Sequence, residues 1–398
     1  MSARARIIAL ILSAQTVANV GPLGIPAIAS LIRADLGLTL AQAGSFLSAY
    51  YIGPSLVSLP AGTLADRWGV KRMLVLGQVV IAVGLLAASV ATSYTAFTLL
   101  LILAGFGYGM LNPTSTKAVM GWAPTAHRAT LVGLKQVGLP LGGMLGAALV
   151  PALALALGWR IAVVLAAVLI AAGAVASLAV YRDPPDAALP PAAPGARGAL
   201  VSVLTSRDLW LLSIATAVFA AMQTVWMSYL VLYLQGAIGL TLLTASRLLA
   251  LAQFGGMTGR VLFGMLSDRL FGGRRRLPLV LAGVGSAACT LVIASTGTGA
   301  STTGLSALAF LFGVVGIGWN GVQHTWMAEL AGPRAAGTAV GLGLGVSSAG
   351  VTLGPILFGY VVQRAGGFHG PWLALALSMV VALGLLSLVR ERRVLPGK

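Results

Sequence analysis

The stretch GTLADRWGVKR, Gly62–Arg72, returns in the second half of the chain as GMLSDRLFGGRRR, Gly264–Arg276. Both copies read Gly-x-x-x-Asp-Arg followed by a basic cluster, and the offset is 202 residues for the glycines (264 − 62) and for the aspartates (268 − 66). This offset is about half of the 398 residues, so the pattern indicates that one unit was duplicated. Because each copy lies between two long apolar runs, the duplicated unit is predicted to be a membrane unit.

The composition excludes an ordinary soluble domain. Apolar residues make up 58% of the chain and charged residues 8%, with a mean hydropathy of +0.96, whereas a soluble domain carries roughly 25% charged residues. The formal charge of +17 does not indicate nucleic-acid binding, because the basic residues recur between apolar runs instead of forming one patch. A single cysteine, Cys289, excludes an internal disulfide.

The apolar runs predict membrane-spanning helices, each of which needs about 20 residues. A segment rich in Pro and Ala, 182–206, separates two sets of runs and is predicted to be a linker between an N-terminal bundle, 1–181, and a C-terminal bundle, 207–398. We expect twelve spans in two pseudo-symmetric six-helix bundles, at 7–29, 40–62, 73–92, 95–120, 129–155, 159–181, 208–234, 243–265, 278–297, 303–328, 337–363 and 370–390.

The distribution of Lys and Arg predicts the orientation of the spans. Of the 25 such residues, only Arg33, Arg160, Arg247 and Arg364 fall in loops on one side, and three lie within spans. The remainder lie in the termini, the linker and the loops of the other side, which is therefore predicted to be cytoplasmic, as are both termini. Because the run after the basic N-terminus is long, we expect an uncleaved first helix in a multi-pass protein of the cell membrane.

The twelve spans, the central linker and the motif after spans 2 and 8 together resemble the major facilitator superfamily. A second pair of similar segments supports the duplication: RATLVGLKQVGLPLGG opens span 5 and RAAGTAVGLGLGVSSAG opens span 11. The resemblance covers the whole chain and implies two six-helix bundles around one central substrate site, reached alternately from each side. A monomer is the usual state of the superfamily, and no enzyme activity, cofactor or metal is expected.

The residues of the repeated motif suit a latch that closes the cytoplasmic side in one state. Small residues such as Gly62 and Gly264 allow close helix crossing, and aspartates suit the start of a neighbouring helix. We therefore expect Asp66 and Asp268 to accept backbone N–H groups there, and Arg67 and Arg269 to bridge to carbonyls or to an acid on the next helix. The alternative is that the basic residues serve orientation alone. Span 4 lacks the Arg that the superfamily often carries there, which argues against proton-driven drug export.

Two cations lie inside predicted spans: Arg260, eight residues before Asp268, and Lys135, seven residues after Arg128. Buried cations need an anionic partner, and a substrate can supply it. The segment GRVLFGMLSDR from Gly259 resembles span 8 of monocarboxylate and oxalate/formate carriers, which implies that Arg260 binds a carboxylate. Those monocarboxylate carriers have an acid where this chain has Gly256, so the resemblance supports binding better than proton coupling. The alternative is that Arg260 snorkels to the cytoplasmic face or hydrogen-bonds carbonyl oxygens of the span, and that Lys135 also snorkels.

Neutral polar and aromatic side chains on the central spans complete a candidate pocket, although each is also a reasonable helix-to-helix hydrogen-bonding group. Near the two cations we expect substrate contacts from Asn19, Asn112, Trp226, Tyr229, Asn320, Gln323 and His324. The sequence therefore predicts a secondary transporter of a small organic anion, most simply a carboxylate, working as a symporter or exchanger with protons or a counter-anion.

Two other function classes fit the sequence less well. A drug or metabolite exporter of the same fold would be expected to carry an embedded acid, whereas this chain carries embedded cations. A membrane enzyme would need a nucleophile and base or a metal set, which three dispersed histidines and one cysteine do not provide, and a receptor would be expected to carry a further soluble domain.

Overall fold

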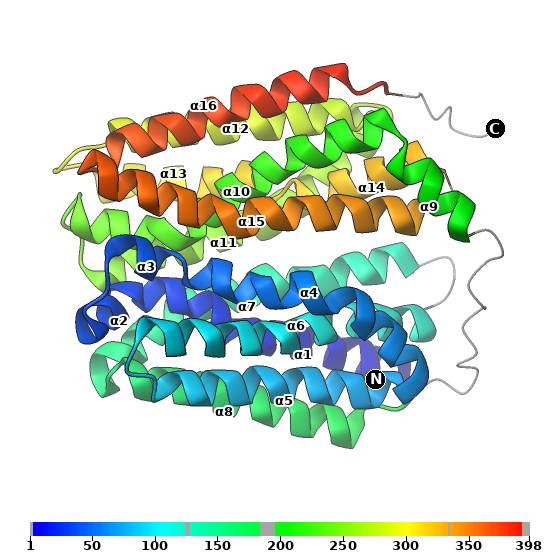
Figure 1. Ribbon diagram of the computed structural model, residues 1–398, viewed down its shortest axis with the longest axis horizontal. Coiled ribbons are helices and arrows are strands. Elements are labelled where there is room, and N and C mark those ends of the chain that lie inside the picture. The colour runs from blue at the N-terminus through cyan, green and yellow to red at the C-terminus, as the bar shows by residue number, and fades with distance from the viewer. Residues whose placement is uncertain (1–2, 124–127, 184–195, 333–334, 392–398) are drawn as a thin grey trace. The chain divides into compact units, whose positions relative to one another are not determined.

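The computed structural model describes residues 3–123, 128–183, 196–332 and 335–391, without the side chains at a few positions inside these ranges, Leu59, Asp66 and Arg128 among them. Figure 1 shows the order of the helices along the chain. The first half contains α1 (Ala3–Gly24), the 3₁₀-helix η1 (Ile25–Ile28), α2 (Ala29–Leu36), α3 (Leu40–Gly44), α4 (Phe46–Trp68), α5 (Val70–Ser89), α6 (Tyr94–Trp122), α7 (Arg128–Leu157) and α8 (Trp159–Val180).

The second half is built in the same way, with two helices interrupted or extended by π-turns. It contains α9 (Ala196–Leu204), α10 (Arg207–Gly236), α11 (Leu242–Met265), the π-helix η3 (Leu266–Leu270), α12 (Arg276–Ser295), α13 (Thr302–Phe312), the π-helix η4 (Gly313–Ile317), α14 (Asn320–Ala331), α15 (Ala336–Ala365) and α16 (His369–Leu388).

The predicted all-α membrane fold is confirmed. Eleven helical segments in the described part of the chain are long and apolar enough to cross a membrane, and they coincide with eleven of the predicted spans. The other predicted span, 40–62, falls on α3 and α4. Large apolar side chains on these helices are exposed, for example Val175 at 66% and Leu377 at 64%, as expected for surfaces that face lipid.

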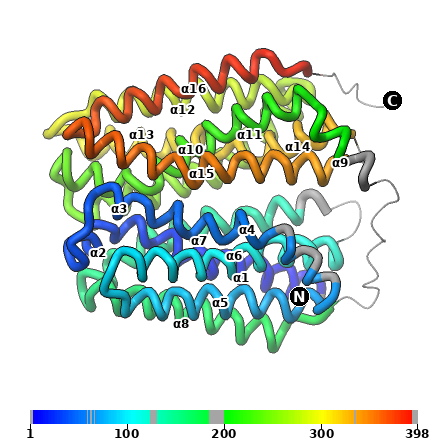
Figure 2. The backbone as a smooth tube through the Cα atoms, in the orientation of Figure 1, coloured from blue at the N-terminus to red at the C-terminus, as the bar shows by residue number. Residues whose placement is uncertain are grey.

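By their internal contacts the helices form two compact units. The first consists of Met1–Leu189, Ser228–Gly236 and Leu240–Ala250, and the second of Pro190–Met227, Ala237–Gly239 and Leu251–Lys398. The two units therefore divide α10 and α11 between them, and the predicted boundary at 182–206 stays a prediction. Within the second unit, α12 and α16 run side by side, as Figure 2 also shows.

Small residues set the closest helix crossings. In the first unit α7 packs on α1, where a Cβ added at Gly142 would lie 2.3 Å from the carbonyl oxygen of Thr16 and 2.7 Å from Cβ of Asn19. In the second unit a Cβ added at Gly259 on α11 would lie 2.2 Å from the carbonyl oxygen of Val314 in η4. Only glycine permits backbones to approach this closely, and these crossings position the polar residues described next.

Candidate functional site

The first unit contains a buried cation, Lys135, on α7. Its side chain is 1% exposed, and its ammonium donates to oxygens of α6: Oδ1 of Asn112 at 2.6 Å, the carbonyl oxygen of Asn112 at 3.1 Å and Oγ1 of Thr116 at 3.0 Å. An ammonium group has three N–H donors, so these contacts use its full donor capacity. Lys135 therefore turns into the unit and does not snorkel to the membrane surface.

A polar network continues from Lys135 towards α1. Gln15 is fully buried, donates to the hydroxyl of Tyr108 at 3.1 Å and accepts from Oγ of Ser115 at 3.3 Å. Asn19, one turn further along α1, is also fully buried and donates to the carbonyl oxygen of Gln15 at 2.6 Å. Its Oδ1 has no hydrogen-bond partner in the described part of the chain. A buried carbonyl oxygen without a donor is costly, so Asn19 can accept a hydrogen bond from a ligand.

In the second unit a break between α13 and α14 supplies polar groups at the middle of a span. The π-turns of η4 and the three glycines Gly313, Gly316 and Gly318 interrupt the helix. Trp319 donates to the carbonyl oxygen of Gly316 at 3.1 Å, and Asn320 donates to the carbonyl oxygen of Ile317 at 3.0 Å. These side chains satisfy carbonyls that the break would otherwise leave unpaired, and single-turn π-bulges are frequent at functional sites.

Arg260 lies on α11 beside this break. The crossing at Gly259 presses α11 against η4, and a Cβ added at Gly318 would lie 2.6 Å from the carbonyl carbon of Gly259. Arg260 is half-buried and lies within electrostatic reach of His324 on α14. The Nε2 atom of His324 is buried and has no hydrogen-bond partner in the described part of the chain. The positive charge of Arg260 thus acts on the imidazole of His324 inside the second unit.

The other residues predicted for the pocket have partners in their own surroundings. Asn320 donates to Oε1 of Gln223 at 3.3 Å, and the buried Gln323 donates to Oγ1 of Thr216 at 3.4 Å. Trp226 is 2% exposed, stacks on Phe312 with ring centroids 3.8 Å apart, and donates to Oγ1 of Thr290 at 3.0 Å. Tyr229, one turn further along α10, is fully buried. Trp226 thus packs as core, and its ligand role stays a prediction.

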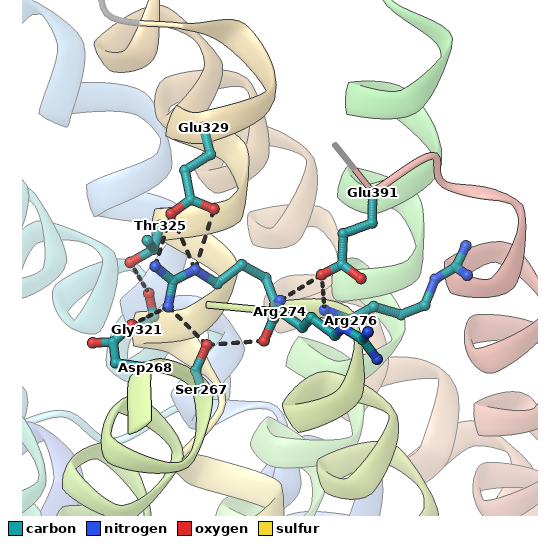
Figure 3. A network of polar contacts seen from close by, with 9 residues as sticks. Ser267, Asp268, Arg274, Arg276, Gly321, Thr325, Glu329 and Glu391 are labelled. Carbon is teal, nitrogen blue, oxygen red and sulfur yellow. Dashed lines mark hydrogen bonds and ion pairs between the residues drawn. The ribbon is translucent and has the colours of Figure 1, made fainter. Parts of the chain in front are cut away.

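At the second copy of the motif, an arginine bridges two helices (Figure 3). Arg275, just before α12, donates through Nη2 to Glu329 on α14 at 2.8 Å and through Nε at 3.1 Å. Its Nη1 donates to Oγ of Ser267 at 2.7 Å and pairs with the carboxylate of Asp268. The side chain of Arg275 is 15% exposed and that of Glu329 28% exposed, so this fork-shaped contact is partly shielded from solvent.

Arg275 lies between two membrane-spanning helical segments, Leu242–Leu270 and Arg276–Ser295. Burial alone would lower the pKa of Arg275, but the hydrogen bonds with Glu329 and Asp268 outweigh it and raise the pKa above its ordinary value. The side chain of Asp268 is 65% exposed, so solvent screens its charge. Asp268 therefore orients the guanidinium of Arg275 but adds little to the strength of the network. Arg275 stays charged at every pH at which the protein would be studied.

Three expectations about the motif need correction. The bridging cation is Arg275, while Arg269 is exposed. The carboxylate at the start of α12 is Glu391, which accepts the backbone N–H groups of Arg275 and Arg276 at 2.5 and 2.9 Å, and Asp268 faces the guanidinium instead. A Cβ added at Gly264 would meet no described atom within 4 Å, so a close crossing does not explain this glycine.

The local backbone explains why Arg275, and not Arg269, forms the bridge. The π-turns of η3 shift the direction of the residues that follow α11, and Gly272 and Gly273, with φ of +57° and +80°, fold the chain back so that Arg275 meets Asp268. In the first copy, the surroundings of Gly62 and the side chain of Asp66 lie outside what the structure describes, and Arg67 is exposed.

Comparison with known proteins identifies the family of this chain. A family model described as the Major Facilitator Superfamily matches residues 8–350. The chain belongs to this superfamily. It is 27% identical over 380 residues to a "Probable sulfoacetate transporter" of Cupriavidus necator, covering 90% of this chain and 87% of the relative. It is 25% identical over 383 residues to a "Hexuronate transporter" of Bacillus subtilis, covering 91% and 89%.

Solved structures of other transporters share the fold. The crystal structure of the nucleoside transporter NupG aligns with a TM-score of 0.79 and 15% identity, covering 98% of this chain and 100% of that one. At this identity the likeness concerns the fold alone. This chain therefore shares the fold of that transporter over 98% of its length.

Several residues that build these clusters were not singled out from the sequence. In the first unit they are Tyr108, Ser115 and Thr116, and in the second unit Thr216, Arg275 and Glu391. Hydroxyl residues are common in membrane helices, so their position alone carries little signal. The pairing of Arg275 with Glu329 could have been inferred from the sequence, because Glu329 is an acid at the end of a span and such an acid needs a cation nearby.

Proposed function

We propose that this protein is a secondary active transporter of a small organic anion, most simply a carboxylate. Membership of the superfamily and the names of its relatives support a transporter rather than an enzyme. The observation that carries the choice of an anion is Arg260, which lies inside the second unit beside the broken span and His324. A cation at the centre of a span costs about 2.5–3.5 kcal/mol on insertion scales, so a cation retained within a span is a candidate for a functional role.

The sequence places no acid in the middle of a predicted span, where it could pair with Arg260 in place of a substrate. Its eight Asp and Glu residues are Asp35, Asp66, Asp183, Asp186, Asp208, Asp268, Glu329 and Glu391, and none falls in the middle of a predicted span. A guanidinium presents two parallel N–H donors that match the two oxygens of a carboxylate. A small carboxylate is therefore the partner that fits Arg260 best.

The relatives support the same class of substrate. Sulfoacetate and hexuronates, the compounds in the names of the two relatives, are both carboxylates. In our proposal Arg260 binds the carboxylate, and His324 contributes a hydrogen bond through its unpartnered Nε2. The remaining predicted contacts, Asn19, Asn112, Asn320 and Gln323, orient the substrate's other polar groups.

Lys135 takes a secondary part in this proposal. Its ammonium already donates to Asn112 and Thr116, so it adds positive potential and holds Asn112 in place without contacting the anion directly. Removing it should therefore weaken binding less than removing Arg260.

Alternating access, coupling and orientation complete the proposal. We propose that the protein works by alternating access as a symporter or exchanger, coupled to protons or to a counter-anion. The distribution of basic residues supports a multi-pass protein of the cell membrane with both termini in the cytoplasm. A monomer is the default of the superfamily and is proposed on that basis.

Uptake by proteoliposomes tests this function. Purified protein is reconstituted, and labelled mono- and dicarboxylates are compared with cationic drugs, with protein-free liposomes as the control. Uptake of one or more carboxylates, in competition with unlabelled carboxylates but not with the drugs, is expected. Transport of the cationic drugs alone would contradict the proposal and support an exporter of the same fold.

A further inference from the structure

An open groove lies on the surface of the first unit, where α4 ends and α5 begins. Its volume is about 490 Å³, and it is lined by Trp68, Lys71, Arg72, Val75, Leu76, Val79 and Leu178. All seven residues belong to α4, α5 and α8, which lie in the first unit, so the groove is complete within that unit.

The exposed lining of the groove is almost wholly apolar, and two cations, Lys71 and Arg72, are among the residues that border it. Lys71 and Arg72 lie in the first turn of α5, while Val75 and Val79 follow one and two turns further along the same helix. Leu178 closes the other side from α8 and is 56% exposed, and Val79 is 41% exposed. The predicted span begins at residue 73, so the two cations lie where an apolar span meets the polar surface of a membrane.

The local backbone fixes this arrangement. Gly69, with φ of +85°, is the only residue between α4 and α5, and this conformation favours glycine. The tight turn holds Trp68, which is 51% exposed, next to the two cations. Leu76 packs against the buried cluster of Ala61, Ala65 and Met73, so the floor of the groove is supported by the core.

The second copy of the motif shows how a basic cluster is neutralised within the protein. There Arg275 pairs with Glu329 and Asp268, and Glu391 accepts the neighbouring backbone N–H groups. In the first copy, neither Lys71 nor Arg72 forms an ion pair with any carboxylate whose side chain the structure describes, including Asp183, which lies close to Gly69. The corresponding helix, α6, contains no acid in its sequence.

We propose that this groove binds an anionic phospholipid, with the phosphate between Lys71 and Arg72 and one acyl chain along Val75, Val79 and Leu178. The two bordering cations and the exposed apolar lining together fit a phospholipid better than a soluble anion, which would leave the apolar lining exposed. Basic pockets at the ends of membrane helices are known to take anionic head groups, and Trp68 suits the same interfacial depth. This site is independent of the proposed substrate site.

Native mass spectrometry of the detergent-purified protein tests the proposal. Dioleoyl phosphatidylglycerol is titrated against dioleoyl phosphatidylcholine, which has the same acyl chains but no net charge. We compare wild type with Lys71→Gln/Arg72→Gln, and with Arg207→Gln/Arg274→Gln, which removes the same charge from exposed positions elsewhere. Because each interfacial cation contributes roughly a fivefold change in affinity, the Lys71→Gln/Arg72→Gln variant should retain the anionic lipid at least about tenfold less well.

Further variants distinguish a bound phospholipid from a bound inorganic anion and from a misfolded protein. Val79→Trp fills the groove without changing its charge and should also reduce retention. Lys71→Arg/Arg72→Lys keeps both charges and should preserve retention, which controls for misfolding. Inorganic phosphate should not raise the unfolding temperature as the anionic lipid does. Equal retention by the Lys71→Gln/Arg72→Gln variant and its control, equal retention of phosphatidylcholine, or equal stabilisation by inorganic phosphate would each overturn the proposal.

Discussion

Lys135 and Asn112 are joined by two hydrogen bonds: the ammonium of Lys135 lies 2.6 Å from Oδ1 of Asn112 and 3.1 Å from its carbonyl oxygen. Together with Thr116, this contact lets the first unit hold a buried cation without any acid near it in the described part of the chain. The cation is satisfied by neutral oxygens, which ties α7 to α6 and makes Lys135 a structural residue as well as a source of positive potential.

Lys135→Met should therefore destabilise the protein. The substitution keeps an unbranched side chain but leaves Oδ1 of Asn112 buried without its donor, which costs about 1–3 kcal/mol. We expect a lower unfolding temperature in detergent and a carboxylate affinity that falls less than in Arg260→Gln. An unfolding temperature equal to that of wild type would show that the contact between Lys135 and Asn112 does not stabilise the fold.

The bridge between Arg275 and Glu329 should behave as a coupled pair. Glu329→Gln and Arg275→Gln each remove one partner from a contact that is largely shielded, and each should cost about 1–3 kcal/mol. The double variant should cost less than the sum of the two, as a double-mutant cycle of unfolding free energies would show. The exposed Arg274→Gln serves as control and should stay within about 0.5 kcal/mol of wild type.

The pH dependence of this pair follows from Arg275. Its pKa is raised in the folded protein, so its stabilising contribution is fully present below the ordinary pKa of arginine and is lost only when the pH rises through the raised value. Mildly alkaline pH should therefore leave the double-mutant coupling energy unchanged. A coupling energy that declines between neutral and mildly alkaline pH would contradict this assignment.

The glycine crossing of α1 and α7 offers a test of packing. Gly142→Ala would place a Cβ 2.3 Å from the carbonyl oxygen of Thr16, so the helices must separate, and we expect a loss of about 1–3 kcal/mol. Gly345→Ala on α15 meets no described atom within 4 Å and is the matched control, expected to be neutral or slightly stabilising. Equal unfolding temperatures for the two variants would rule out the crossing as a source of stability.

The repeated motif can be tested as a latch. Asp66→Asn and Asp268→Asn should slow interconversion or change which side is open, because each removes the motif's negative charge, next to the basic cluster that follows it. Labelling of cysteines introduced at the two ends of the spans would report this as altered accessibility, with insertion unchanged. If both variants keep wild-type accessibility and full transport, the motif does not act as a latch.

The sequence predicted the spans well because their signal is local. A run of some 20 apolar residues in a chain with 8% charge has few alternatives to a membrane helix, and the repeat at 202 residues pointed to the family. The electrostatic interaction between Arg260 and His324 was not predictable from spacing, because the course of the chain around them depends on the crossing at Gly259 and on the break at η4. Periodicity does not reveal a π-turn, and for the same reason the sequence points to Arg269 where Arg275 forms the bridge.

Polar residues in the spans were ambiguous for a different reason. Trp226 and Asn112 looked alike as pocket candidates, but Trp226 stacks on Phe312 in the core, while Asn112 holds a buried cation. Which of two such roles a residue takes depends on neighbours distant in the sequence, here 86 positions away for Phe312 (312 − 226) and 23 for Lys135.

The most direct test of the anion site is a calorimetric titration of a carboxylate panel into wild type, Arg260→Gln, Arg260→Lys and Arg247→Gln, the last an exposed cation on the same helix. Loss of a charge-assisted partner costs about 1.5–3 kcal/mol, so Arg260→Gln should bind the true substrate at least about tenfold more weakly. Arg260→Lys should recover little of this, because a point charge does not reproduce the planar fork, and Arg247→Gln should bind as wild type. Binding by Arg260→Gln as tight as by wild type would contradict the assignment and favour an exporter of the same fold.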